Sequence, residues 1–199
     1  VFDGTIEENV HAGRTYVTAE DVRWALEMSE FEDDVAKMSK GLQTRVLSAG
    51  QNLSHGQIQR LLIARAIVGR PRLLILDEAF TGIDESVTSR ILDRIFDGGH
   101  PWTIVDISHE PQIMLRTGQV SVLSGGKIAE RGTPEGLSAD PNGPFSRLFP
   151  FVSAGLRRGA AAPARLGPEV ESARPTESSP DPDSDATPPA RPDVEGEKP

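Results

Sequence analysis

The fold of this chain is decided by two short stretches, LSHGQ at residues 53–57 and LLILDE at residues 73–78. The first contains the S-x-x-Q pattern that begins helices, because the serine and the glutamine each bind a free backbone N–H group of the other. The second is a continuous apolar run that ends in two carboxylates, which is typical of a strand buried on both faces of a parallel sheet. Together they indicate an α/β fold.

The segments around these stretches alternate between helix and strand patterns. Apolar residues at helical spacing predict helices over residues 19–28, 31–38, 54–68, 85–96 and 111–116. A polar loop is expected over residues 41–52, and a second buried strand over residues 103–107. Residues 120–123 and 127–130 predict a hairpin around Gly125-Gly126. Strand, helix and strand in this order imply a right-handed parallel crossover.

Length, charge and composition limit the classes of protein. A chain of 199 residues can build one core, although its mean hydropathy of −0.34 indicates that part of it does not fold. The net charge of −9 argues against a nucleic-acid-binding surface. The chain has no cysteine, which excludes disulfides and thiolate metal sites. No apolar stretch approaches the roughly 20 residues of a membrane helix.

The composition changes sharply near Ser153. Beyond this residue the chain is rich in alanine, proline, serine and acidic residues, as in SSPDPDSD at residues 178–185. Such a segment buries too little apolar surface to offset its chain entropy, so we expect residues 153–199 to be disordered. A docking tail is the functional alternative.

Ser54, Gly56 and Gln57 have both a structural and a functional interpretation. As a capping box, they only begin a helix. As an anion site, the same helix N-terminus directs free N–H groups and a partial positive charge at a phosphate. Gly56 would let the backbone approach the phosphate, and the Ser54 hydroxyl would add a hydrogen bond. We therefore expect Ser54 to cap the helix when the site is empty and to turn to phosphate when it is occupied.

Carboxylates and a histidine follow the two predicted strands. Asp77 and Glu78 lie at the carboxyl end of the first strand, where α/β sheets hold their ligands. Asp77 suits Mg²⁺, and Glu78 suits a general base or a group that orients water. His109 ends the second strand, and the parallel crossover brings it to the same sheet edge. The simpler interpretation is a helix N-cap followed by an acidic first turn, with a structural or exposed histidine.

These motifs, in this order, resemble the ATP-binding domain of ABC transporters. LSHGQ is similar to the LSGGQ signature of that family, LLILDE to its Walker B strand with the catalytic glutamate, and His109 to its switch histidine. TGID at residues 81–84 resembles its D-loop, and GGKIAERG at residues 125–132 matches a hairpin near the end of the domain. GTIEENV at residues 4–10 resembles a stretch of exporter-type members.

The chain also departs from this family pattern. His55 stands where the signature has glycine, and Ala79-Phe80 stands where the family usually has Pro-Thr. LSAG at residues 47–50 replaces the charged residues that are usual in the loop that senses the membrane domain.

The resemblance implies a P-loop NTPase-like, mostly parallel sheet with a helical subdomain. Residues 1–69 would form the helical and signature part, and residues 70–152 the α/β part. The implied ligands are ATP and Mg²⁺. The implied roles are Glu78 and His109 for catalysis, Asp77 for Mg²⁺ through water, Asp84 in the D-loop, and Ser54, His55, Gly56 and Gln57 for ATP bound by a second such domain.

A P-loop of the form G-x-x-x-x-G-K-[ST] does not occur in the 199 residues, because Gly126-Lys127 has the wrong neighbours and predicts a hairpin turn. We therefore expect the N-terminal part of the domain to be missing from this sequence, and the chain alone to bind ATP weakly without hydrolysing it. The implied partners are a second ATP-binding domain, in a homo- or heterodimer, and a membrane-spanning domain, with no nucleic acid. They would place the chain at the cytoplasmic face of the cell membrane.

Two alternatives remain open. The chain would be a non-catalytic partner subunit if it contributed only its signature helix to a heterodimer, although the intact Glu78 and His109 speak against this. The second alternative is a DNA-repair or chromosome-maintenance ATPase that uses the same signature. The acidic charge and the absence of long heptad runs near residue 53 disfavour that class.

Overall fold

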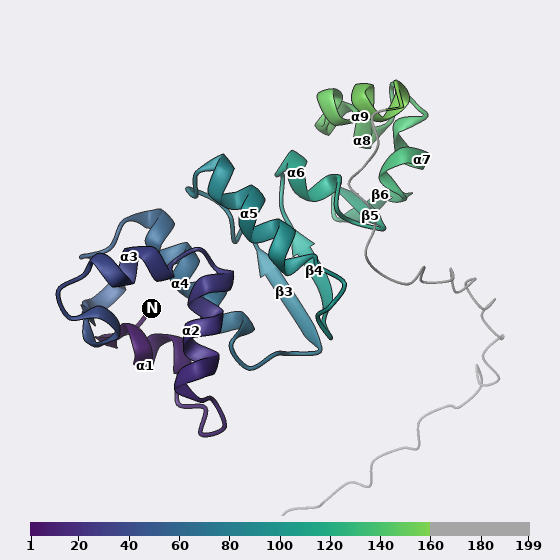
Figure 1. Cartoon of the computed structure of the whole chain (residues 1–199). Coiled ribbons are helices and arrows are strands. Elements are labelled where there is room, and N and C mark those ends of the chain that lie inside the picture. Colours follow the sequence, from purple (N-terminus) through teal and green to yellow (C-terminus); the bar gives the residue numbers. More distant parts are fainter. Residues whose placement is uncertain (160–199) are drawn as a thin grey trace, which may run out of the picture. The chain divides into compact units, whose positions relative to one another are not determined.

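The structure, a computed structural model, describes residues 1–159 (Figure 1). The elements follow in chain order: β1 (Gly4–Thr5), α1 (Ile6–His11), α2 (Ala19–Met28), α3 (Glu32–Lys37), β2 (Arg45–Val46), α4 (His55–Ile67), β3 (Leu73–Asp77), α5 (Glu85–Ile95), β4 (Thr103–Ile107), α6 (Pro111–Met114), β5 (Val120–Ser124), β6 (Lys127–Gly132), α7 (Pro134–Ser138), α8 (Pro144–Leu148) and α9 (Pro150–Arg157). Short 3₁₀ turns lie at Gly41–Gln43 and Ser48–Gly50.

The α/β class and the parallel crossover are confirmed. β3 and β4 pair in parallel, with Leu74 opposite Ile104 and Leu76 opposite Asp106, and α5 lies between them in the sequence. α2 and β4 have the predicted bounds, while α4 is capped by Ser54 and Val68 at its two ends. Parallel strands cannot be joined by a tight turn, so α5 is the crossover that this pairing requires.

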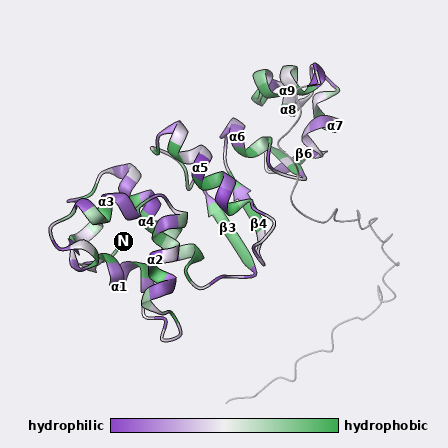
Figure 2. Ribbon diagram, in the orientation of Figure 1, coloured by the Kyte–Doolittle hydropathy of each residue, from purple (hydrophilic) through white to green (hydrophobic). Residues whose placement is uncertain are grey.

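The predicted burial of β3 and β4 on both faces is wrong for the described residues. Figure 2 shows β3 as a strongly hydrophobic strand. However, Leu74 and Leu76 are buried, whereas Leu73 and Ile75 are 53% and 60% exposed. Val105 and Ile107 of β4 are exposed as well. The buried side chains of β3 belong to the same core as the inner face of α5, and no element among residues 1–159 buries the other face.

The N-terminal helices form a packed group around α4. α1 and α2 both contact α4, and the apolar core there includes Ile6, Val10, Val22, Ala25, Leu61 and Ala64. Arg65 of α4 fixes α1, because its guanidinium donates to the backbone oxygen of Asn9 at 2.6 Å and also to its side-chain oxygen. α1 was not predicted as a helix. It has only six residues, too few for a helical period, and a Thr5–Glu8 capping box starts it.

Residues 41–52 are more ordered than the predicted polar loop. β2 pairs with β1 in an antiparallel register, with Gly4 opposite Val46, and a 3₁₀ turn lies on each side of β2. Val46 is fully buried, and Asn52 joins the two sides of the segment by accepting from Leu47 N and donating to the Arg45 carbonyl. Non-local pairing with β1, which a local pattern does not reveal, orders this segment.

The predicted hairpin is confirmed, whereas the predicted boundary at Ser153 is wrong. β5 and β6 are antiparallel around Gly125-Gly126, whose φ angles of 56° and 75° suit glycine. Ser153 lies inside α9, fully buried, with its hydroxyl 2.6 Å from that of Ser146 and 2.7 Å from Arg157 Nη1. Residues 153–159 are therefore ordered, and residues 160–199 of the predicted tail lie outside the described residues. Among residues 1–159 no helix has the length and apolarity to cross a membrane.

Candidate functional site

Glu78 and His109 meet at the carboxyl ends of β3 and β4. His109 Nδ1 lies 3.1 Å from Glu78 Oε1, within hydrogen-bond distance, and the side chains are 74% and 46% exposed. The parallel register causes this meeting, because both residues follow the last paired position of their strands. The imidazole can donate an N–H to Oε1 and so orient the carboxylate, while Oε2, which also accepts from the Thr81 hydroxyl, keeps a lone pair that can accept a proton from water.

The backbone of Glu78 adopts an uncommon conformation. Its φ of 47° lies in the left-handed region, which residues other than glycine rarely adopt. The turn is held by the Glu78 N–H, which donates to the Ile107 carbonyl at 2.9 Å, and by the Thr81 hydroxyl, which donates to Glu78 Oε2 at 3.2 Å. Such conformations persist where the surroundings fix them, and they are frequent at functional sites.

Asp77 lies on the open face of the two-stranded sheet. It pairs in register with Ile107 at the end of β4, and its side chain is exposed. A single exposed carboxylate suits Mg²⁺, which usually binds one or two carboxylates together with waters and phosphate oxygens. Within residues 1–159 no three or more histidine, aspartate or glutamate side chains form a ready metal cluster. Asp77 therefore fits a metal held jointly with a phosphate rather than by the protein alone.

Asp106 is a carboxylate that the sequence pattern did not single out. It lies among apolar residues inside β4, opposite Leu76, and neither of its buried carboxylate oxygens has a hydrogen-bond partner among the described residues. Burial, and then the charges of Glu78, Asp77 and Glu110, raise its pKa to about 6. An aspartate that interrupts the apolar run TIVDI was the available signal. The sheet end thus concentrates negative charge that a cation would relieve.

The start of α4 is closed by its own capping box. Ser54 accepts from the Gln57 N–H at 3.2 Å, and the Gln57 side chain accepts from the Ser54 N–H at 3.0 Å, as the S-x-x-Q pattern predicts. The Gln57 amide also donates to Asp34 Oδ1 at 2.8 Å. Asp34, which lies on α3, was missed by sequence reasoning because no local pattern links it to α4.

Asp34 and Arg60 hold this helix start in place. Arg60 Nη1 donates to Asp34 Oδ2 at 2.8 Å, and Arg60 Nε donates to the Gly56 carbonyl at 3.3 Å. Partial burial acts to raise the pKa of Asp34, but the hydrogen bonds from Gln57 and Arg60 outweigh it and lower that pKa. The carboxylate therefore stays charged and keeps both partners oriented.

His55 and Gly56 lie against the loop between β3 and α5. A Cβ atom at Gly56 would come within 2.9 Å of the Gly82 carbonyl oxygen, and a Cβ atom at Gly82 would overlap the His55 ring. Gly82 has a φ of 78°, which also suits glycine. The structure thus joins two predicted segments, the LSHGQ stretch and TGID, within one chain.

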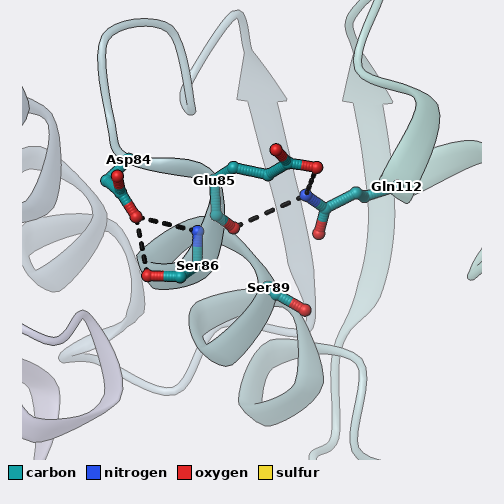
Figure 3. Close-up of a pocket in the computed structure, with 5 residues that line it drawn as sticks. All are labelled: Asp84, Glu85, Ser86, Ser89 and Gln112. Carbon is teal, nitrogen blue, oxygen red and sulfur yellow. Dashed lines mark hydrogen bonds between the residues drawn. The ribbon is translucent and has the colours of Figure 1, made fainter.

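Asp84 ends this loop and caps α5 (Figure 3). Its Oδ1 accepts from the backbone N–H of Ser86 at 2.9 Å and from the Ser86 hydroxyl at 2.6 Å, and these bonds lower the pKa of Asp84. Beside it lies an open hollow of about 620 Å³, lined by Asp84, Glu85, Ser86, Ser89 and Gln112. The Gln112 amide donates to Glu85 Oε1 across the hollow at 3.4 Å. Asp84 is therefore fixed as a helix cap next to the loop that contacts α4.

Comparisons with known proteins agree with these motifs. A family model described as ABC transporter matches residues 3–81. The chain is 36% identical over 152 residues to ABC transporter B family member 21 of Arabidopsis thaliana, 39% over 140 residues to the transport/processing ATP-binding protein ComA of Streptococcus pneumoniae, and 34% over 140 residues to the probable multidrug resistance ABC transporter ATP-binding/permease protein YheI of Bacillus subtilis. These alignments cover 75%, 70% and 70% of this chain, but 12%, 19% and 24% of the relatives.

A solved structure gives the same likeness in three dimensions. A bacterial Atm1-family ABC exporter with ATP bound superposes with a TM-score of 0.71 at 28% identity, covering 81% of this chain and 27% of that chain. The chain therefore spans about a quarter or less of the length of the relatives that it matches.

Proposed function

The chain belongs to the ABC transporter family as an exporter-type ATP-binding domain, and from this premise we propose that it takes part in ATP hydrolysis that drives transport across a membrane. The observation that carries the proposal is the contact between Glu78 and His109 at the end of a parallel strand pair. Glu78 orients and deprotonates the water that attacks the terminal phosphate of ATP. His109 holds the carboxylate in position for this step.

The ligands of this proposal are ATP and Mg²⁺. When bound, Mg²⁺ neutralises charge on the phosphates of ATP. Asp77, whose carboxylate is exposed at the strand end, would hold the ion through a water molecule. The high density of negative charge around Asp106 is compatible with a nearby cation. Asp84 keeps the D-loop in place by capping α5.

The P-loop, which does not occur in these 199 residues, would come from a polypeptide segment outside them. The apolar side chains of Leu73, Ile75, Val105 and Ile107 lie on the open face of the sheet. A cluster of exposed aliphatic side chains on two adjacent strands supports the idea that a further layer covers this face. We propose that this layer carries the P-loop and belongs to the same ATP-binding domain.

The start of α4 serves a different nucleotide. Ser54, His55, Gly56 and Gln57 would face ATP held by the P-loop of a second ATP-binding domain, in a homo- or heterodimer. The 13-residue α4 offers its N-terminal dipole and backbone N–H groups to an anion there. A membrane-spanning domain, in the same or another chain, would hold this pair at the cytoplasmic face of the membrane.

Replacing the base tests the proposal. In the complete transporter that contains this chain, Glu78→Gln should reduce steady-state ATP hydrolysis at least about 100-fold and leave ATP trapped, because the amide orients water but accepts no proton. Glu20→Gln on the exposed first turn of α2 is the matched control and should leave turnover unchanged. Unaltered turnover in Glu78→Gln would remove Glu78 from the base role. The 199-residue chain alone should show no turnover, so turnover there that depends on Glu78 would contradict the proposed division of the site.

A further inference from the structure

The side-chain amide of Gln57 is engaged at both ends. Its Oε1 accepts from the Ser54 N–H at 3.0 Å, and its Nε2 donates to Asp34 Oδ1 at 2.8 Å. A backbone N–H only donates and a carboxylate only accepts, so one orientation of the amide satisfies both neighbours. Asp34, on α3, therefore selects the orientation in which Gln57 caps the start of α4.

Asp34 is itself held by Arg60. Its Oδ2 accepts from Arg60 Nη1 at 2.8 Å, and both side chains are partly buried. The Arg60 guanidinium also lies over the ring of Phe31, 5.5 Å from the ring centroid, and Phe31 is fully buried. The carboxylate is thus fixed by a neighbour other than Gln57, and it serves as an anchor for that side chain.

This anchor makes the two halves of the capping box unequal. The Ser54 hydroxyl accepts from the Gln57 N–H at 3.2 Å, and rotation about one bond turns it away. The Gln57 side chain has a second partner on another helix, so it stays in place when the hydroxyl leaves. The backbone N–H of Ser54 then keeps its acceptor. The N–H groups of the first helical turn stay aligned, as an anion site at a helix start requires.

We propose that Asp34 is a positioning residue for the nucleotide that the start of α4 serves. It holds the Gln57 amide in the capping orientation, so that the first turn stays formed when the Ser54 hydroxyl turns to a phosphate. The inference rests on the proposed function, since the phosphate is taken there to be that of ATP held by a second domain. The charge of Asp34 is paired with Arg60, so the anchor adds little repulsion of its own toward the phosphate.

The anchor is tested in the 199-residue chain without nucleotide, by amide hydrogen exchange at Ser54. Asp34→Asn keeps the shape of the side chain but offers one acceptor oxygen to two donors, Gln57 and Arg60. It should speed exchange at Ser54 by about tenfold, the order expected when a hydrogen bond to a charged group is lost. Asp33→Asn makes the same charge change at an exposed neighbour on α3, and this control should leave exchange within about twofold. Equal effects of the two variants would overturn the anchor.

A reciprocal swap of groups identifies the contact even where a single variant loses stability. Gln57→Glu keeps an acceptor for the Ser54 N–H but sets a carboxylate against Asp34, so it should also speed exchange at Ser54. Combined with Asp34→Asn, it again places a donor opposite an acceptor and leaves the amide oxygen for Arg60. The double variant should return exchange to within about twofold of the unsubstituted chain. Additive effects of the two substitutions would overturn the proposal.

The response to inorganic phosphate separates positioning from charge. By charge alone, Asp34→Asn should tighten phosphate binding at the start of α4, because it removes a negative charge and leaves Arg60 unpaired. If Asp34 acts by positioning, the dissociation constant read from the backbone amides of His55 and Gly56 should instead rise about fivefold, the order of a lost helix cap. Asp33→Asn should leave it unchanged or lower it. Tighter phosphate binding in Asp34→Asn would overturn the proposal.

Turnover in the complete transporter distinguishes this role from that of the base. Asp34→Asn should raise KM for ATP about fivefold with kcat within about twofold, because the helix start binds the phosphate before and during hydrolysis alike. Glu78→Gln should instead lower kcat. A KM that Asp34→Asn leaves unchanged would overturn the proposal. A transporter that hydrolyses no ATP would contradict the proposed function, whereas exchange at Ser54 decides independently whether Asp34 orients Gln57.

Discussion

The two halves of the candidate site differ in how far the protein satisfies its own polar groups. At the start of α4, Ser54 and Gln57 bind each other, and Asp34 and Arg60 complete the network. At the end of the sheet, several carboxylates lie together, and both oxygens of Asp106 have no partner among the described residues. One half is thus preformed around neutral and paired groups, and the other half keeps an excess of negative charge.

This difference shows what each half requires from a ligand. A preformed helix start offers N–H groups and a dipole, so it suits an anion that adds to an existing structure. A carboxylate-rich strand end is electrostatically unfavourable by itself, so it gains from a cation. ATP with Mg²⁺ has both charges, and the two halves therefore suit opposite ends of the same kind of ligand.

The largest effect is expected from breaking the network at α4. Arg60→Ala should lower the free energy of unfolding by about 3 kcal/mol, because Asp34 would keep its charge in a partly buried place without its partner. The side chains of Arg60 and Asp34 are 14% and 30% exposed. Chemical denaturation of the 199-residue chain measures the loss, and Arg72→Ala, at an exposed arginine, is the control, with an expected change within about 0.5 kcal/mol. A loss at Arg60 no larger than at Arg72 would mean that the helix start is not held by this network.

At the sheet end we expect a smaller change in the free energy of unfolding, with a substitution that stabilises the chain. The folded chain binds a proton at Asp106 more tightly than the unfolded chain, because the pKa is raised from 3.8 to about 6. The free energy of unfolding should therefore fall as the pH rises through this range, and stay lower above it. Asp106→Asn removes this titration and should make the chain more stable at pH 8 by about 1 kcal/mol, a value discounted for partial exposure.

The pH dependence separates charge from shape at Asp106. At pH 3, which lies below the pKa of Asp106 in both the folded and the unfolded chain, the carboxyl is protonated in both states, so the difference between Asp106→Asn and the unsubstituted chain should nearly vanish there. Denaturation at both pH values measures the two differences. The same difference at pH 3 and pH 8 would show that the pKa of Asp106 does not differ between the folded and the unfolded chain.

Local patterns predicted part of each half of the site. The capping box at Ser54 follows from four consecutive residues, and the meeting of Glu78 and His109 follows from a parallel crossover of predictable hand. The Gln57–Asp34 contact joins residues on different helices, so no periodicity reveals it. The open face of β3 was missed for another reason: a continuous apolar run indicates that both faces are meant to be covered, but not that the cover lies within the described residues.

The smallest change in stability is expected from the single hydrogen bond between the Ser54 hydroxyl and the Gln57 N–H. Ser54→Ala should cost about 1 kcal/mol of the free energy of unfolding, because it removes the acceptor of the Gln57 N–H at an exposed helix start. Thr18→Ala, at the matched capping box of α2, should cost about the same by the same principle. The two variants should differ in phosphate response: the unsubstituted chain and Thr18→Ala should be stabilised alike by high phosphate, and Ser54→Ala less. Equal stabilisation of all three by phosphate would mean that Ser54 acts only as a helix cap and does not bind phosphate.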